Sequence, residues 1–363
     1  MNYLGRQRRL AEELRRQHAP VLLVTHLPNI FYLCGFTGSS GALLVSATER
    51  APRVTLFTDG RYTEQAKAEV KNARVVISKL PAVVEACNSA RKLKPKAVFF
   101  EAANISYSAV NQIRHQLRAA GIQTKPLAGV LEQLRVVKDS DEINGLRSAV
   151  ELGSSLFDGL AGSIKPGVPE AQVAGELELA ARKAGAEKMS FDTIVAAGAR
   201  SALPHGRASS QPVPGNGFII LDYGVILAGY CSDMTRTLHV GPVSEKHRRM
   251  YEAVKQAQLA SIAAVRPGAE AEEVDLAGRQ VLRQAGFDAY FTHSTGHGVG
   301  IEIHEQPRIA RGQKQKLAPG MVITIEPGIY IPEEGGVRIE DMVLVTATGH
   351  EVLTPTTKDL ITV

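Results

Sequence analysis

The feature that most constrains the fold is an internal repeat in the second half of the chain. Residues 164–185, IKPGVPEAQVAGELELAARKAG, align without a gap with residues 265–286, VRPGAEAEEVDLAGRQVLRQAG, at an offset of 101. Each copy precedes a histidine-bearing segment and then an apolar run that ends in an acid, GFIILDYG in one case and GMVITIEPG in the other. Because repeated units of this kind bury a core by stacking on each other, we expect a domain of two related halves, each with two helices followed by strands.

The first third of the chain has a different sequence pattern. From Pro20 to about Leu131, short apolar runs such as VLLVTH, ALLVSA and AVFFEA alternate with helix-like stretches such as YSAVNQIRHQLRAAG. This alternation predicts a small α/β domain. Near Arg135 the sequence changes to RVVKDSDEI, where Asp139 or Ser140 can cap a long amphipathic helix. We therefore predict two domains, an α/β domain at residues 1–133 and an α+β domain at residues 134–363.

Composition restricts the compartment and the partners. The net charge of +5 is spread over interspersed acidic and basic residues, so no basic face for nucleic acid is expected. The basic, helix-like start is not followed by an apolar stretch that could form a signal-peptide core or a membrane span. Three scattered cysteines are too few for a disulfide framework or a thiolate metal site. We expect a cytoplasmic protein that binds neither nucleic acid nor membranes.

Two acids fall in one predicted hairpin of the first half. In GFIILDYGVILAGYCSDMTRT, a turn centred between Leu227 and Ala228 would place Asp222 directly opposite Asp233. Their β-carbons would then be about 5 Å apart. Two carboxylates that close repel each other, so they persist as a pair only by sharing a proton or by binding a cation.

The second half supplies two matching acids. Glu326 ends the apolar run MVITIEPG, and Glu340 lies in VRIEDMVLV, two residues from Arg338. One acid at the end of a strand is usually a solvated terminus, but four such acids on four apolar runs, with histidines between them, indicate a site. Carboxylates with one imidazole suit a divalent cation such as Mn²⁺, and Co²⁺ or Zn²⁺ can occupy the same ligands. The number of ligands implies two bridged ions.

Three of the ten histidines lie in the glycine-rich segment HSTGHGVGIEIHEQP, at His293, His297 and His304. The segment is not the helical HExxH motif of zinc proteases, because its glycines disfavour a helix. We expect an extended segment whose glycines let the backbone approach a site closely.

Taken together, PHG, ILDYG, SDMTRT, HSTGHGVGIEIHEQP, TIEPGIY and VRIED resemble the motifs of the pita-bread metallopeptidases, in the aminopeptidase P and prolidase branch. FTDGRYTEQA and LRVVKDSDEI resemble the same branch, so the resemblance covers nearly the whole chain. It implies a creatinase-like N-terminal domain, a pita-bread catalytic domain with a pseudo-two-fold duplication, and a homodimer. Creatinase shares the fold but lacks the metal ligands, which are all present here.

The resemblance also implies roles for individual residues. The ligands of two metal ions would be Asp222, Asp233, His297, Glu326 and Glu340. Of these, Asp233 and Glu340 would bridge the ions, and the share of Glu326 is left open. The other matching positions are His205 and His304, which would contact substrate and the tetrahedral intermediate, His293 and Arg338, which would support the site, and Phe191, near the proline pocket.

From these residues we expect a Xaa-Pro aminopeptidase that acts on small peptides with proline in the second position. Two divalent ions about 3.5 Å apart would supply hydroxide near neutral pH. His304 would donate to the oxyanion, and Glu326 would carry a proton to the leaving proline nitrogen. The alternative is a Xaa-Pro dipeptidase, or prolidase, which needs a cation for the proline carboxylate; Arg308 could supply it, although FTDGRY favours aminopeptidase P. A more distant alternative is a peptide-binding homologue without catalysis.

Overall fold

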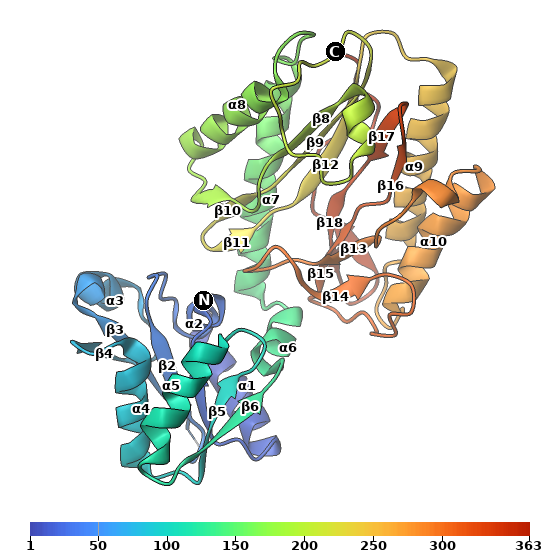
Figure 1. Ribbon diagram of the computed structural model, residues 1–363. Helices are drawn as coiled ribbons and strands as arrows, with labels where there is room; N and C mark the ends of the chain where they lie inside the picture. The colour runs from blue at the N-terminus through green and yellow to red at the C-terminus, as the bar shows by residue number, and fades with distance from the viewer. Residues whose placement is uncertain (50) are drawn as a thin grey trace. The chain divides into compact units, whose positions relative to one another are not determined.

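A computed structural model describes residues 1–49 and 51–363 of the protein (Figure 1). The chain forms two compact units, Met1–Arg135 and Val136–Val363. No helix of the described residues has both the length and the apolarity that a membrane span requires.

The first unit is an α/β domain, as its alternating sequence predicts. Its six strands form one mixed sheet in the order β4-β3-β2-β1-β5-β6. Apolar residues of α4 and α5 pack on this sheet and form the core of the unit. The strands are β1 (Val21–Val24), β2 (Ala42–Ser46), β3 (Arg53–Asp59), β4 (Arg74–Ser78), β5 (Ala97–Glu101) and β6 (Gln123–Leu127). The helices are α1 (Tyr3–Arg16), α2 (Leu27–Cys34), α3 (Thr63–Glu69), α4 (Ala82–Leu93), α5 (Tyr107–Arg118) and α6 (Val130–Val136), whose last residue is the first of the second unit.

The second unit contains two successive sets of helices and strands, as the sequence repeat predicts. The first half comprises α7 (Ser140–Ala161), α8 (Glu170–Lys183), β7 (Lys188–Met189), β8 (Ile194–Ala197), β9 (Gly217–Tyr223), β10 (Val225–Leu227), β11 (Tyr230–Cys231) and β12 (Met234–Val240). The second half comprises α9 (Glu245–Ala264), α10 (Ala271–Gln284), β13 (Gly296–Gly298), β14 (Glu305–Ile309), β15 (Val322–Ile325), β16 (Gly328–Ile331), β17 (Gly335–Arg338), β18 (Asp341–Val345) and β19 (His350–Val352). The main sheets have the orders β12-β9-β8 and β14-β13-β15-β18-β19.

The sequence repeat is a structural repeat. Helix α10 begins and ends 101 residues after α8. Gly167 and Gly268, which precede the two helices, both have left-handed backbones, with φ of 88° and 81°. The amide of Gly167 donates to the carbonyl of Val213, and the amide of Gly268 donates to that of Leu317. Each half therefore has an equivalent backbone hydrogen bond at this position, and the helix boundaries of the two halves correspond.

The predicted pairing of Asp222 with Asp233 was wrong by two residues. Asp222 pairs with Thr235, and the turn is formed by Ala228 and Gly229, with φ of 50° and 78°. Two left-handed residues make the tight turn that suits a hairpin, and an Asn-Gly dipeptide would have signalled it. Alanine gives no such signal, so the turn was placed one residue too early. Because side chains alternate with a period of two, both acids still belong to the same face of the hairpin.

Candidate metal centre

The four acids of the predicted ligand set lie at corresponding ends of strands, and the fifth predicted ligand, His297, lies within a neighbouring strand. Asp222 is the penultimate residue of β9, and Glu326 directly follows β15. Asp233 directly precedes β12, and Glu340 directly precedes β18. Each pair of strands, β9 with β12 and β15 with β18, is antiparallel, so the end of one strand lies beside the start of the next. His297 lies in β13, the neighbour of β15.

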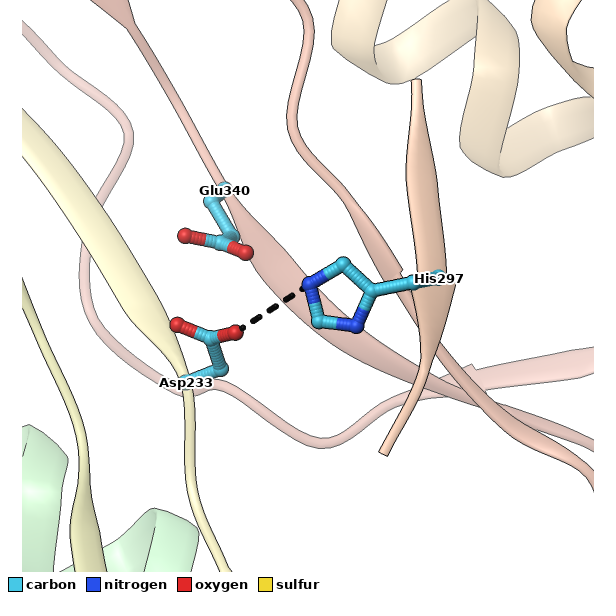
Figure 2. Close-up of side chains that lie close together, drawn as sticks. All are labelled: Asp233, His297 and Glu340. Atoms are coloured by element: carbon cyan, nitrogen blue, oxygen red, sulfur yellow. Dashed lines mark ion pairs between the residues drawn. The ribbon is translucent and has the colours of Figure 1, made fainter. Parts of the chain in front are cut away.

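Three of these side chains converge closely. One ligand atom from each of Asp233, His297 and Glu340 lies within 4.8 Å of the others, and Figure 2 shows them approaching from three separate segments. The Nε2 atom of His297 is 3.6 Å from a carboxylate oxygen of Asp233 and 3.5 Å from one of Glu326. This set of carboxylates and one imidazole suits divalent cations of the Mn²⁺, Co²⁺ and Zn²⁺ type.

Asp222 has one oxygen paired and one without a partner. Its Oδ2 atom accepts a hydrogen bond of 2.6 Å from Arg338. Its Oδ1 atom is buried and has no hydrogen-bond partner among the described residues. A buried acceptor without a partner is rare in folded proteins, and at this place it leaves a free carboxylate oxygen for a cation. Arg338 also donates to the hydroxyls of Tyr330, at 2.5 Å, and Thr235, at 3.2 Å.

Two threonine hydroxyls that the sequence reasoning missed orient the candidate ligands. Thr235 donates to Glu340 at 2.6 Å. Thr324 lies 3.3 Å from a carboxylate oxygen of Glu326 and accepts a hydrogen bond of 3.0 Å from the amide of His297. Hydrogen bonds of this kind fix the rotamers of metal ligands. The sequence could have indicated the role of Thr324, because this residue is two positions before Glu326 in one strand-like run and therefore lies on the same face of the strand.

Burial and mutual repulsion raise the pKa values of three of the acids, Asp233, Glu326 and Glu340. Burial raises the pKa of Asp233 and of Glu340, and repulsion from the neighbouring carboxylates adds to the shift. Burial raises the pKa of Glu326 to about 8, against the attraction of Arg338. Burial lowers the pKa of His297 to about 4, which keeps its imidazole neutral, as metal binding requires. A bound cation would relieve the repulsion and favour the ionised acids.

Further predicted residues surround this cluster. The rings of His304 and His297 have centroids 4.4 Å apart. His293 lies 2.9 Å from the hydroxyl of Tyr330, a residue that the sequence reasoning missed although it falls in TIEPGIY. Burial lowers the pKa of His293 to about 4, with repulsion from Arg338 adding to the effect.

Two predicted site residues make no hydrogen bond, ion pair or ring contact with the cluster among the described residues. His205 is exposed and lies within electrostatic range of His304. Phe191 is half-buried in the loop between β7 and β8, and within the described part of the chain it makes no ring contact with the cluster. Its place in a proline pocket stays a prediction.

Both units match the models of known protein families. Residues 144–347 match the model of metallopeptidase family M24, and residues 6–137 match that of the creatinase/prolidase N-terminal domain. Together these matches extend over most of the chain.

Individual relatives agree with the family models. The chain is 38% identical over 333 residues to a Xaa-Pro dipeptidase of Pyrococcus furiosus, which covers 92% of each chain. It resembles the structure of a Xaa-Pro dipeptidase from Bacillus anthracis with a TM-score of 0.95 at 38% identity, over 100% of both chains. It also resembles the structure of an X-Pro aminopeptidase from Thermotoga maritima with a TM-score of 0.89 at 32% identity, over 97% of this chain and 100% of the other.

Proposed function

Since the chain belongs to metallopeptidase family M24 and is a metallo-exopeptidase, we propose that it is a prolidase, which hydrolyses dipeptides of the form Xaa-Pro. This choice reverses the order of the two sequence-based interpretations, in which the aminopeptidase came first. It is supported by relatives named Xaa-Pro dipeptidase that match nearly the whole chain. The Thermotoga maritima relative, named X-Pro aminopeptidase, keeps the aminopeptidase as the alternative.

The observation that favours the dipeptidase is the position of Arg308. It pairs with His297 across β13 and β14. Residues directly opposite each other in an antiparallel pair project from the same face of the sheet. Arg308 is exposed and has no ion-pair partner among the described residues. It can therefore offer its guanidinium to the carboxylate of a C-terminal proline, which a dipeptide has next to its scissile bond and a longer peptide does not.

The proposed chemistry divides the work among the residues of the cluster. Asp222, Asp233, His297, Glu326 and Glu340 would hold two divalent ions, Mn²⁺ being our first choice. Such ions supply hydroxide at neutral pH and polarise the scissile carbonyl. Glu326, with its raised pKa, would carry the proton to the leaving proline nitrogen.

The remaining residues would act on substrate and charge. His304 would donate to the oxyanion that forms on the scissile carbonyl. Arg338 would offset the excess carboxylate charge through Asp222. Phe191 and His205 would line the substrate site. A homodimer and a cytoplasmic location stay predictions from the sequence.

Substrate length tests this proposal directly. With Mn²⁺ supplied, the protein should cleave Xaa-Pro dipeptides and leave Xaa-Pro-Yaa tripeptides nearly untouched. Arg308→Ala should raise KM for the dipeptide by about ten- to a hundredfold, the effect of losing a hydrogen bond to a charged group. Arg308→Lys should recover part of the loss, and Arg311→Ala, at an exposed arginine nearby, should have no effect.

Two results would contradict the proposal. Efficient cleavage of tripeptides would assign the protein to the aminopeptidases. Full activity after exhaustive chelation would exclude the metal-dependent reaction.

A further inference from the structure

Lys138 is a lysine with a buried side chain near the start of the second unit. Its ammonium donates to Glu305 at 3.1 Å and to the carbonyl of Val136 at 3.3 Å. The side chains of Lys138 and Glu305 are only 1% and 7% exposed. Burying two charges costs desolvation, and an apolar pair of the same shape is often at least as stable. The ion pair therefore calls for an explanation other than stability.

The place of Glu305 supplies that explanation. Glu305 directly follows His304 and is the first residue of β14. Its carboxylate also accepts a hydrogen bond of 3.2 Å from the amide of Glu302, whose carbonyl accepts one of 3.1 Å from the amide of Gly300. Glu305 thus closes the loop of residues 299–304, which joins β13 to β14. His297 lies just before this loop and His304 lies at its end.

The other end of the ion pair is anchored to regular structure. The amide of Lys138 donates to the carbonyl of Gly320 at 2.9 Å. The next residue, Asp139, caps α7 through a reciprocal pair of hydrogen bonds with Glu142. Lys138 is therefore held in place by α7 and by the segment before β15. Through its ion pair with Glu305 it can fix the loop of residues 299–304.

We propose that Lys138 is a positioning residue for catalysis. Through its ion pair with Glu305 it fixes the loop of residues 299–304, and so it holds the ring of His304 beside that of His297. This inference rests on the proposed function, in which His304 donates to the oxyanion. Such a donor acts only at a fixed distance, and a displacement of about 1 Å can lower the rate by about a hundredfold.

The first test compares kcat, KM and bound metal among variants of the Mn²⁺-loaded protein. Lys138→Met and Glu305→Gln should each lower kcat by roughly ten- to a hundredfold, with KM and metal content little changed. The double variant Lys138→Met/Glu305→Gln removes both charges of this ion pair together, so it should fold and still show the low kcat. Lys138→Arg should recover part of the activity.

A more exposed ion pair in the same unit serves as a control. Arg147 of α7 forms a bidentate ion pair with Glu351 of β19, which likewise joins this helix to the second sheet. Arg147→Met/Glu351→Gln should leave kcat unchanged. A well-folded Lys138→Met/Glu305→Gln protein with the kcat of the unaltered protein would overturn the inference.

The second test asks whether Lys138 acts through His304. In a His304→Ala background, Lys138→Met should lower kcat by less than twofold, since the donor it positions is already gone. An effect as large as in the unaltered protein would overturn the inference. Hydrogen exchange of the peptide spanning residues 299–305 supplies a measurement independent of activity, and it should be faster in the Lys138→Met/Glu305→Gln protein than in the control.

The two hypotheses fail in different ways. Absence of Xaa-Pro hydrolysis by the unaltered, metal-loaded protein would refute the proposed function. Unchanged exchange of residues 299–305 in the double variant would refute the inference on Lys138, whatever the substrate.

Discussion

The two halves of the second unit share a scaffold but treat corresponding acids differently. Asp222 at the end of β9 and Glu326 at the end of β15 occupy matching places. Asp222 is paired with Arg338 at 2.6 Å. Glu326 has the hydroxyl of Thr324 beside it, 3.3 Å away, and burial raises its pKa to about 8.

This difference teaches how a duplicated fold produces an asymmetric site. Arg338 donates to one carboxylate oxygen of Asp222 and leaves the other without a partner among the described residues, which suits a metal ligand. Glu326 has no direct arginine partner among the described residues, and its pKa of about 8 suits a group that also transfers a proton near neutral pH. The repeated helices thus provide symmetric positions, and individual side chains outside the repeat give those positions different chemistry.

The largest effect is expected where the halves must act together. Asp233→Ala removes an acid of the first half and Glu340→Ala its counterpart in the second. Each should lower turnover by a factor on the order of 10⁴ or more, since without the ions the pKa of water returns from about 7 towards 15.7. Each should also lower bound metal, as measured by elemental analysis. Asp192→Ala, at an exposed acid of the first half, should change neither quantity; an active Asp233→Ala protein would refute the shared site.

The next effect tests the asymmetry itself. Arg338→Met should destabilise the metal-free protein by about 3–5 kcal/mol, because it leaves the carboxylate of Asp222 buried and uncompensated. Chemical denaturation would measure this loss. Arg338→Met/Asp222→Asn should recover much of it. If Arg338→Met left stability unchanged, the distinction between Asp222 and Glu326 would lose its basis.

Substitution of His304, in the second half, should cause a smaller loss of activity. His304→Ala should lower kcat by about a hundredfold, as expected for the loss of one oxyanion donor. Bound metal should stay near normal, and His115→Ala on the first unit should have no effect. Loss of metal from His304→Ala would mean that this histidine is a ligand.

The smallest effect concerns pH and the metal-free protein. Between pH 6.5 and 8, the folded state keeps a proton on Glu326 that the unfolded chain, with an ordinary pKa near 4.5, has already released. Stability from this group is complete below pH 4.5 and is lost as the pH rises through about 8. The free energy of unfolding should therefore fall by about 2 kcal/mol across this window.

His297 and His293 do not oppose this trend. Their pKa values are lowered to about 4 from 6.5, so their contribution is lost only as the pH falls below 6.5. Added Mn²⁺ should reverse the slope above pH 6.5, since ligands bind metal in their deprotonated forms. A metal-free protein equally stable at pH 6.5 and 8, measured by denaturation, would show that Glu326 is not protonated as proposed.

The sequence by itself determined the repeat, the α/β class of the first unit and the chemical types in the site, and the pita-bread class followed from the resemblance of its motifs to a known family. The repeat and the site chemistry follow from local signals: Pro-Gly before α8 and α10, helical periodicity within them, and acids at the ends of apolar runs. Such signals are complete within a short window of residues, so they can be read without knowing what the segment packs against.

Only the tertiary structure decided which side chains meet. The turn at Ala228 and Gly229 set the strand register, and the pairs Arg338 with Asp222 and Lys138 with Glu305 join residues more than 100 positions apart. Contacts of this kind depend on how strands and loops pack, and no local pattern encodes them. The repeat of the two halves could therefore be predicted from the sequence. The difference in hydrogen-bond partners between Asp222 and Glu326 arises from tertiary packing.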